Sequence, residues 1–184
     1  MKLTHSNTTL TALAQQGGFT ENAFDYAKGG LELDSDYPYT SGKAGVTGSC
    51  DVPSDAAAQV KTVSYTNVAS SAADESTMGA YVASTGPLSI VVDASAWSTY
   101  TGGILSSCGT SLDHAVQAVG IDTDEGSWKV RNSWGTSWGE SGFIRLKYGE
   151  NMCGLASDAN YATVASAKSV NPILGADSST YSPK

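Results

Sequence analysis

The pattern of hydrophobic and polar residues changes from helical to alternating along the chain. Residues 20–30 carry an apolar face at helical spacing, start at a candidate N-cap, Thr20, and stop at two glycines, which predicts a short helix. Residues 74–85 show a second helical pattern, ended by a Gly-Pro pair. The chain therefore begins with helical signals and then changes period.

Most of the remaining chain has the alternating, β-branched composition of strands. The segments with this pattern are 59–68, 88–94, 114–122, 127–133, 142–148 and 161–165. Closely spaced strands after a helical start predict an α+β protein with an antiparallel sheet or barrel. Residues 34–50 read as a loop, and residues 166–184 read as a flexible tail containing Ser, Ala and Pro.

Composition narrows the class of protein. The chain has 184 residues, which is enough for one domain with a hydrophobic core. Its net charge of −8 argues against a nucleic-acid partner, which requires a basic surface. No apolar run approaches the ~20 residues that span a bilayer, and the polar N-terminus is a poor secretory signal, so we expect no membrane partner.

One of the two histidines, His114, opens an apolar strand, and Asn132 ends the next predicted strand. If a tight turn near Gly126 joins the two as antiparallel neighbours, these side chains lie side by side. An amide oxygen that accepts the imidazole N–H fixes the ring and leaves the other nitrogen free to exchange a proton. Trp134 and Trp138 follow at once and could exclude water from that bond.

A structural explanation of the same residues stays open at this point. A lone histidine at a strand start is often packed away, Asn before Ser-Trp-Gly is typical of a turn, and tryptophans are typical of a core. The three cysteines, Cys50, Cys108 and Cys153, fit no zinc or CxxC spacing. Their odd number leaves at least one thiol without an intramolecular partner.

Longer motifs decide between these explanations. "LDHAVQAVG" and "RNSWGTSWGESGFIRL" resemble the histidine and asparagine motifs of papain-like cysteine proteases. Further similar segments follow the family's order: "GGFTENAFDYAK", "DSDYPYTSG", "GPLSIVVDA", "YTGGI" and "MCGLASDANYATV". The resemblance assigns residues 17–165 to the C-terminal portion of the peptidase domain, with 1–16 as a non-matching segment. It implies an α+β fold, mainly the antiparallel β-barrel right-hand lobe plus a remnant helix of the left-hand lobe.

The resemblance also implies roles for single residues. His114 is the acid/base and Asn132 orients it, with Trp134 and Trp138 in support. A peptide or protein substrate is then expected to contact Gly17, Gly18, Val91, Asp113, Ala115 and Asp158. Asp158 lies at the floor of the S2 pocket in this alignment, with Val91 and Ala115 as its walls. Cys108 pairs with Cys153, Cys50 stays free, and no metal or cofactor is implied.

The sequence departs from the family at the nucleophile. None of the three cysteines lies in a Cys-Gly-Ser/Ala-Cys-Trp/Tyr motif, which the family places about 130–150 residues before its histidine, and the glutamine of the oxyanion hole is missing as well. The sequence therefore predicts a truncated cysteine endopeptidase that is inactive alone.

Several origins of such a chain remain open. It could be a partial gene product, the result of a mispredicted start, or one half of a two-chain enzyme whose partner is the N-terminal lobe. The alternative function is a non-catalytic pseudo-protease that binds peptides or titrates inhibitors. A β-rich interaction domain with accidental motif matches is a third, weaker alternative. The resemblance implies a lysosomal, vacuolar or secreted location.

Overall fold

The computed structural model describes residues 18–33, 35–38, 40 and 59–165. Its helices and strands are α2 (Thr20–Tyr26), β1 (Thr62–Ala69), α4 (Glu75–Ser84), β2 (Leu88–Val92), β3 (Ile104–Leu105), β4 (His114–Asp122), β5 (Ser127–Arg131), β6 (Phe143–Lys147) and β7 (Ala159–Val164). Each predicted helix and strand is present within a few residues of its expected bounds. The predictions for segment 1–16, Gly17, most of loop 34–50 including Cys50, and tail 166–184 lie outside the described residues.

Helix α2 starts at Thr20 but is not capped by it. Phe19 occupies the N-cap position without a side-chain cap, and the Thr20 hydroxyl instead donates to the Glu21 carboxylate at 3.4 Å. The prediction of Thr20 as N-cap is therefore wrong, because Thr20 is already the first helical residue and the cap position falls on Phe19. A 3₁₀ turn continues the helix to Gly29, and Gly30 ends it with a φ of 113°, which favours glycine. No helix in the described part of the chain is long and apolar enough to span a membrane.

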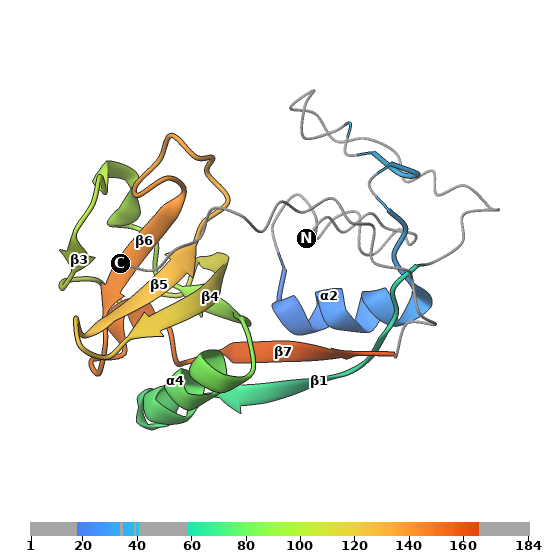
Figure 1. The fold of residues 1–184 in the computed structure, drawn as a ribbon, viewed down its shortest axis with the longest axis horizontal. Coiled ribbons are helices and arrows are strands. Elements are labelled where there is room, and N and C mark those ends of the chain that lie inside the picture. The colour runs from blue at the N-terminus through green and yellow to red at the C-terminus, as the bar shows by residue number, and fades with distance from the viewer. Residues whose placement is uncertain (1–17, 34, 39, 41–58, 166–184) are drawn as a thin grey trace.

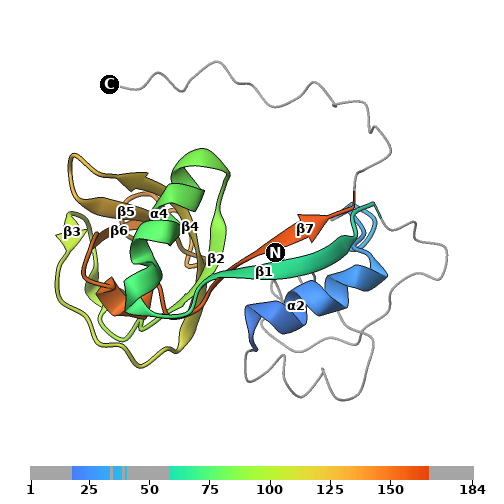
Figure 2. The same cartoon turned by 90° about the horizontal axis from the view of Figure 1, so that it is seen from below.

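Seven strands form one sheet in the order β1-β7-β2-β4-β5-β6-β3. All pairings are antiparallel except that of the short β3 with β6, which is parallel. Strands β1 and β7 extend from the rest of the sheet as a two-stranded ribbon, and α2 lies along it (Figure 1). The view from below shows α4 against the other, more compact part of the sheet (Figure 2). The predicted α+β class is confirmed.

The core lies on one face of the compact part of the sheet. Alternate strand residues are fully buried there: Leu88, Ile90, Val92, Ala118, Trp128, Val130, Ile144 and Leu146. Met78 and Val82 of α4 also belong to this cluster. The intervening residues of β4, β5 and β6 point to the other face and include Gln117, Lys129 and Arg131, of which Lys129 and Arg131 are exposed. This alternation of buried and outward-facing residues is the pattern that predicts strands from the sequence.

Candidate active site

His114 and Asn132 lie together at the end of β4 and β5. His114 is the first residue of β4, and Asn132 follows β5 directly. The strand register pairs Gln117 with Arg131, so the two side chains are diagonal neighbours across the sheet. The distance from His114 Nε2 to Asn132 Oδ1 is 2.9 Å. The structure therefore places the predicted pair in hydrogen-bonding contact, with Asn132 one residue beyond the strand that was expected to contain it.

The neighbouring backbone fixes the tautomer of His114. The Ser133 N–H donates to the same Asn132 side-chain atom at 2.7 Å. A backbone N–H can only donate, so this atom is the amide oxygen, and the hydrogen of the His114–Asn132 bond must lie on Nε2. Nδ1 of the neutral ring then carries a free lone pair. The arrangement presents one imidazole nitrogen that can accept and return a proton.

Two tryptophans contact the imidazole, and a third stacks on one of them. The ring centroid of Trp134 is 5.2 Å from that of His114, and the edge-on ring of Trp97 is 6.1 Å away. Trp138 stacks on Trp97, and its indole N–H donates to the Trp97 carbonyl at 3.1 Å. Trp97 is fully buried, whereas Trp134 is 42% exposed, so the ring is packed on its inner side and partly covered on its outer side. Trp97 was not singled out from the sequence.

The buried amide nitrogen of Asn132 has no hydrogen-bond partner among the described residues. Asn132 lines a groove of about 1040 Å³ over the outer face of β4, β5 and β6. The strand residues that line this groove include Gln117, Val119, Lys129, Arg131, Phe143 and Arg145. Native proteins rarely leave a buried donor unpaired. The buried Asn132 amide N–H therefore lacks an acceptor among the described residues.

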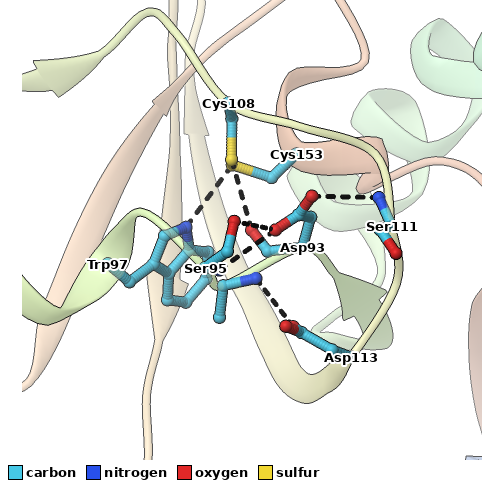
Figure 3. The surroundings of a disulfide bond; sticks show 8 residues. Asp93, Ser95, Trp97, Cys108, Ser111, Asp113 and Cys153 are labelled. Carbon is cyan, nitrogen blue, oxygen red and sulfur yellow. Dashed lines mark hydrogen bonds between the residues drawn. A yellow bond between two sulfur atoms is a disulfide. The ribbon is translucent and has the colours of Figure 1, made fainter.

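A disulfide anchors the loop that leads into His114. Cys108 is bonded to Cys153, which confirms the predicted pairing, and the Trp97 indole N–H donates to the Cys153 sulfur at 3.4 Å (Figure 3). Beside the disulfide, the buried Asp93 carboxylate accepts bonds from the hydroxyl and N–H of Ser95 and from the N–H of Ser111. These bonds join the end of β2 to the loop three residues before His114.

The hydrogen bonds to Asp93 also change its pKa. The Ser95 hydroxyl, and then the N–H groups of Ser95 and Ser111, hold the pKa of Asp93 below its usual range. Asp113 accepts the Ala94 N–H at 2.8 Å, so this carboxylate is engaged with the backbone after β2. Asp113 was assigned to substrate binding from the resemblance, and the structure shows an anchoring contact for it.

Replacing Gly109 with alanine is expected to weaken this anchor. A Cβ at Gly109 would overlap Asp93 Oδ2, so the carboxylate or the loop must shift. We expect Gly109→Ala to lower the free energy of unfolding by about 1–3 kcal/mol in urea titrations at pH 7. Gly102→Ala is the control, because its Cβ would meet its nearest neighbour at an ordinary 3.5 Å.

The pH dependence of the Gly109→Ala effect provides a second measurement. Because the folded-state pKa of Asp93 is lowered, its contribution to stability is present above the unfolded pKa of about 3.9 and is lost as the pH falls through the folded value. The stability difference between Gly109→Ala and the parent chain should therefore shrink on acidification. Equal stability of the two chains at pH 7 would show that Asp93 does not hold this loop.

A second group of predicted residues meets where β2, β4 and β7 approach each other. Val91 pairs with Ala115 across the sheet, and the Val91 N–H donates to the Asp158 carbonyl at 3.1 Å. Asp158 is half-buried, and burial, followed by the negative charge of Glu21, raises the pKa of its carboxyl. Gly18 is exposed at the start of α2. Glu21 was not singled out from the sequence.

The described residues contain no group of three or more His, Cys, Asp and Glu side chains placed to hold an ion. The chemistry that the His114–Asn132 pair can perform is proton transfer at one imidazole nitrogen, beside the Trp134 and Trp97 rings.

Comparisons with known proteins identify the family of the chain. The sequence profile described as "Papain family cysteine protease" matches residues 5–163. The oryzain beta chain of Oryza sativa is 38% identical over 167 residues, covering 85% of this chain and 34% of that protein. Cathepsin L1 of Drosophila melanogaster is 37% identical over 170 residues, covering 80% of this chain and 41% of that protein. This chain thus spans about a third to less than half of the length of these relatives.

Solved structures give the same result for the fold. The bromelain protease of Ananas comosus, solved in complex with the E64 inhibitor, matches with a TM-score of 0.68 and 32% identity, covering 80% of this chain and 70% of that one. The cysteine protease CMS1MS2 of Carica candamarcensis, also solved with E-64, matches with a TM-score of 0.68 and 38% identity, covering 80% and 69%. The chain belongs to the papain family of cysteine proteases.

Proposed function

We propose that this chain contributes the acid/base half of a cysteine peptidase site that hydrolyses peptide bonds in peptide or protein substrates. The observation that carries the proposal is the 2.9 Å bond from His114 Nε2 to Asn132 Oδ1, which leaves Nδ1 free. Nδ1 would take the proton of a cysteine thiol, and the thiolate would attack the substrate carbonyl. The imidazolium would then give that proton to the leaving amine, and water would release the acyl group.

The thiol has no evident source within the described residues. Cys108 and Cys153 are joined to each other, so neither can form a thiolate while the bridge is intact. Cys50 is not in the family's nucleophile motif. We therefore propose that the 184-residue chain by itself does not cleave peptides, and that a segment carrying the nucleophile completes the site.

The groove over β4, β5 and β6 is the proposed docking surface for that segment, whether it lies on a separate chain or on the same polypeptide. Asn132 is one of the residues that line this groove, so a segment packed into it would lie beside the His114–Asn132 pair. Lys129 and Arg131 are exposed and take part in no ion pair among the described residues, so they favour an acidic partner surface. These features support a partner that packs beside the His114–Asn132 pair.

Reconstitution tests the proposed function. A papain-family N-terminal lobe, with its Cys-Gly-Ser-Cys-Trp motif, would be fused ahead of Gly17. The fusion should show thiol-dependent peptide cleavage that an epoxide inhibitor blocks. The unmodified chain should neither cleave peptides nor be labelled at Cys50 by the epoxide. Epoxide-sensitive cleavage by the unmodified 184-residue chain would contradict the proposal.

Selectivity at the second residue before the scissile bond (P2) tests the role of Asp158. By the resemblance, its carboxylate lies at the base of the pocket for that side chain, beside Val91 and Ala115. In the reconstituted enzyme, Asp158→Ala should lower the ratio of cleavage rates for P2-Arg over P2-Leu substrates by about tenfold, since a charge-assisted bond is lost. Asp25→Ala is the control, because Asp25 is exposed and paired with Lys28. An unchanged ratio would remove Asp158 from the pocket.

The disulfide supports the proposed location. Cys108–Cys153 would persist in an oxidising compartment and is rarely formed in the cytosol. A secreted, vacuolar or lysosomal location fits this chemistry.

A further inference from the structure

The disulfide beside the active site is accessible at one of its two sulfurs. Cys108 is half-buried and lies between the exposed residues Ser107 and Gly109, whereas Cys153 is only 1% exposed. The thiolate of a reductant can therefore approach the Cys108 sulfur but not the Cys153 sulfur. Thiol–disulfide exchange begins with such an attack, so Cys108 takes the sulfur of the reductant and Cys153 is the leaving sulfur.

Both sulfurs already have partners that suit the reduced state. The Trp97 indole N–H donates to the Cys153 sulfur at 3.4 Å, and a donor in this position stabilises the negative charge of a departing thiolate (Figure 3). The Cys108 sulfur lies 3.2 Å from the Asp93 carbonyl oxygen. This sulfur has no hydrogen in the disulfide, but a Cys108 thiol could donate one to that oxygen. Contacts that stabilise the dithiol make a disulfide easier to reduce.

Trp97 connects the Cys153 sulfur to the imidazole of His114. Its ring is fully buried and lies edge-on to the His114 ring, with the two centroids 6.1 Å apart. It also contacts Trp134 and Trp138, at centroid distances of 6.4 and 6.0 Å. Closely packed interiors transmit small displacements from one side chain to the next. A change of charge or position at the sulfur therefore reaches the imidazole through one side chain.

The loop before β4 is held by more than the disulfide. The Asp93 carboxylate accepts the Ser111 N–H at 2.9 Å, and Asp113 accepts the Ala94 N–H at 2.8 Å. The Asp93 N–H in turn donates to the Cys153 carbonyl at 2.8 Å. None of these bonds involves a sulfur atom, so reduction leaves them in place. The chain can thus exist in two states that share one fold and differ at the bridge.

We infer that the Cys108–Cys153 disulfide is a redox switch for the active site and that Trp97 is the positioning residue that transmits its state to His114. The intact bridge holds the indole, and with it the imidazole, in the observed arrangement. Reduction by a dithiol frees the indole and loosens the imidazole. This inference rests on the proposed function, in which His114 is the acid/base, and adds a means of regulating that same site.

The switching reaction is an exchange with a dithiol reductant. One thiolate of the reductant attacks the Cys108 sulfur, the S–S bond breaks, and its electron pair leaves on the Cys153 sulfur, beside the Trp97 N–H. The second thiolate of the reductant then attacks the reductant sulfur of the mixed disulfide and releases Cys108. The two protons that the reductant loses end on the two cysteines. The protein gains two electrons, and the dithiol becomes a cyclic disulfide.

NMR spectra of the intact 184-residue chain test the inference without requiring catalysis. A Cys50→Ser background removes the third cysteine of the sequence, and dithiothreitol is the dithiol. On reduction, the His114 ring signals and the Trp97 indole signal should shift while the backbone amide signals stay dispersed. Oxidised glutathione, added after the reductant is removed, should restore the first spectrum. The double variant Cys108→Ala, Cys153→Ala should lack the oxidised-state His114 signals even without reductant.

The rate of reduction measures the role of the Trp97 N–H. Trp97→Phe keeps an aromatic ring but loses the donor, so reduction by dithiothreitol should slow by about tenfold, the effect of one hydrogen bond to a sulfur that becomes charged. Trp134→Phe is the matched control, because it also removes an indole N–H near His114 but leaves the Trp97 bond to sulfur intact. It should be reduced at the parent rate. Alkylation and mass spectrometry count the thiols over time.

The outcomes separate this inference from the proposed function. Unchanged His114 signals in a chain whose two sulfurs are both reduced would overturn the switch. Equal reduction rates of Trp97→Phe and the parent would remove the indole N–H from the reaction. Loss of amide dispersion on reduction would show a structural cross-link without a folded reduced state, which also overturns the inference. None of these results depends on the reconstituted enzyme, whose failure to cleave peptides would count against the proposed function alone.

Discussion

Replacing His114 with alanine in the reconstituted peptidase is expected to lower kcat by roughly 10⁶, the cost of removing the base from comparable nucleophile–histidine pairs. The reason is local. His114 Nδ1 is a free nitrogen on a ring that the Asn132 oxygen and the Trp134 and Trp97 rings hold in place. Without it, the thiol keeps its proton and the leaving amine receives none. Steady-state cleavage of a fluorogenic peptide measures the loss.

Two further variants separate chemistry from folding. Asn132→Ala should cause a smaller loss than His114→Ala, because the imidazole remains but can rotate and change tautomer. Ser106→Ala, at an exposed position outside the groove, should be neutral. Full activity of His114→Ala would show that another group moves the proton. Peptide binding by every variant without any turnover would instead support the non-catalytic alternative.

The strands could be predicted because their side chains alternate between core and surface. In β2, for example, Leu88, Ile90 and Val92 are fully buried and the residues between them are not. Strand β3 has two residues and pairs in parallel with β6, so it has no period to detect. Its position depends on distant chain segments, and sequence alternation does not encode those contacts.

The part of the candidate site whose residues come from neighbouring strands could be predicted from the sequence. His114 and Asn132 lie on consecutive strands joined by a short turn, so local geometry sufficed to bring them together. Glu21 and Trp97 were missed for the opposite reason. Glu21 is linked to Asp158 through Asn160, which donates to both carboxylates, and Trp97 contacts His114 from a 3₁₀ turn after β2. Such contacts follow from tertiary structure and leave no spacing in the sequence.

Replacing the buried Glu75 with alanine is expected to destabilise the fold by about 3–5 kcal/mol. Its side chain accepts the Trp128 indole N–H at 2.8 Å, the Gly149 N–H at 2.9 Å and the Asn151 N–H at 2.8 Å. Alanine would leave three donors without a partner and a cavity between α4 and β5. Urea denaturation followed by tryptophan fluorescence measures the change in the free energy of unfolding.

Two comparison variants distinguish the loss of the three hydrogen bonds to Glu75 from the loss of a negative charge. Glu75→Gln keeps the size of the side chain but has one acceptor oxygen, so its loss should be smaller than that of Glu75→Ala. Glu150→Ala removes an exposed carboxylate paired with Lys147 and should cost less than about 1 kcal/mol. If Glu75→Ala costs no more than Glu150→Ala, the three donors find other acceptors and the anchor is dispensable. Because the turn at Asn151 also carries Cys153, which binds the loop leading into His114, a weakened anchor should also shift the His114 ring signals in NMR spectra.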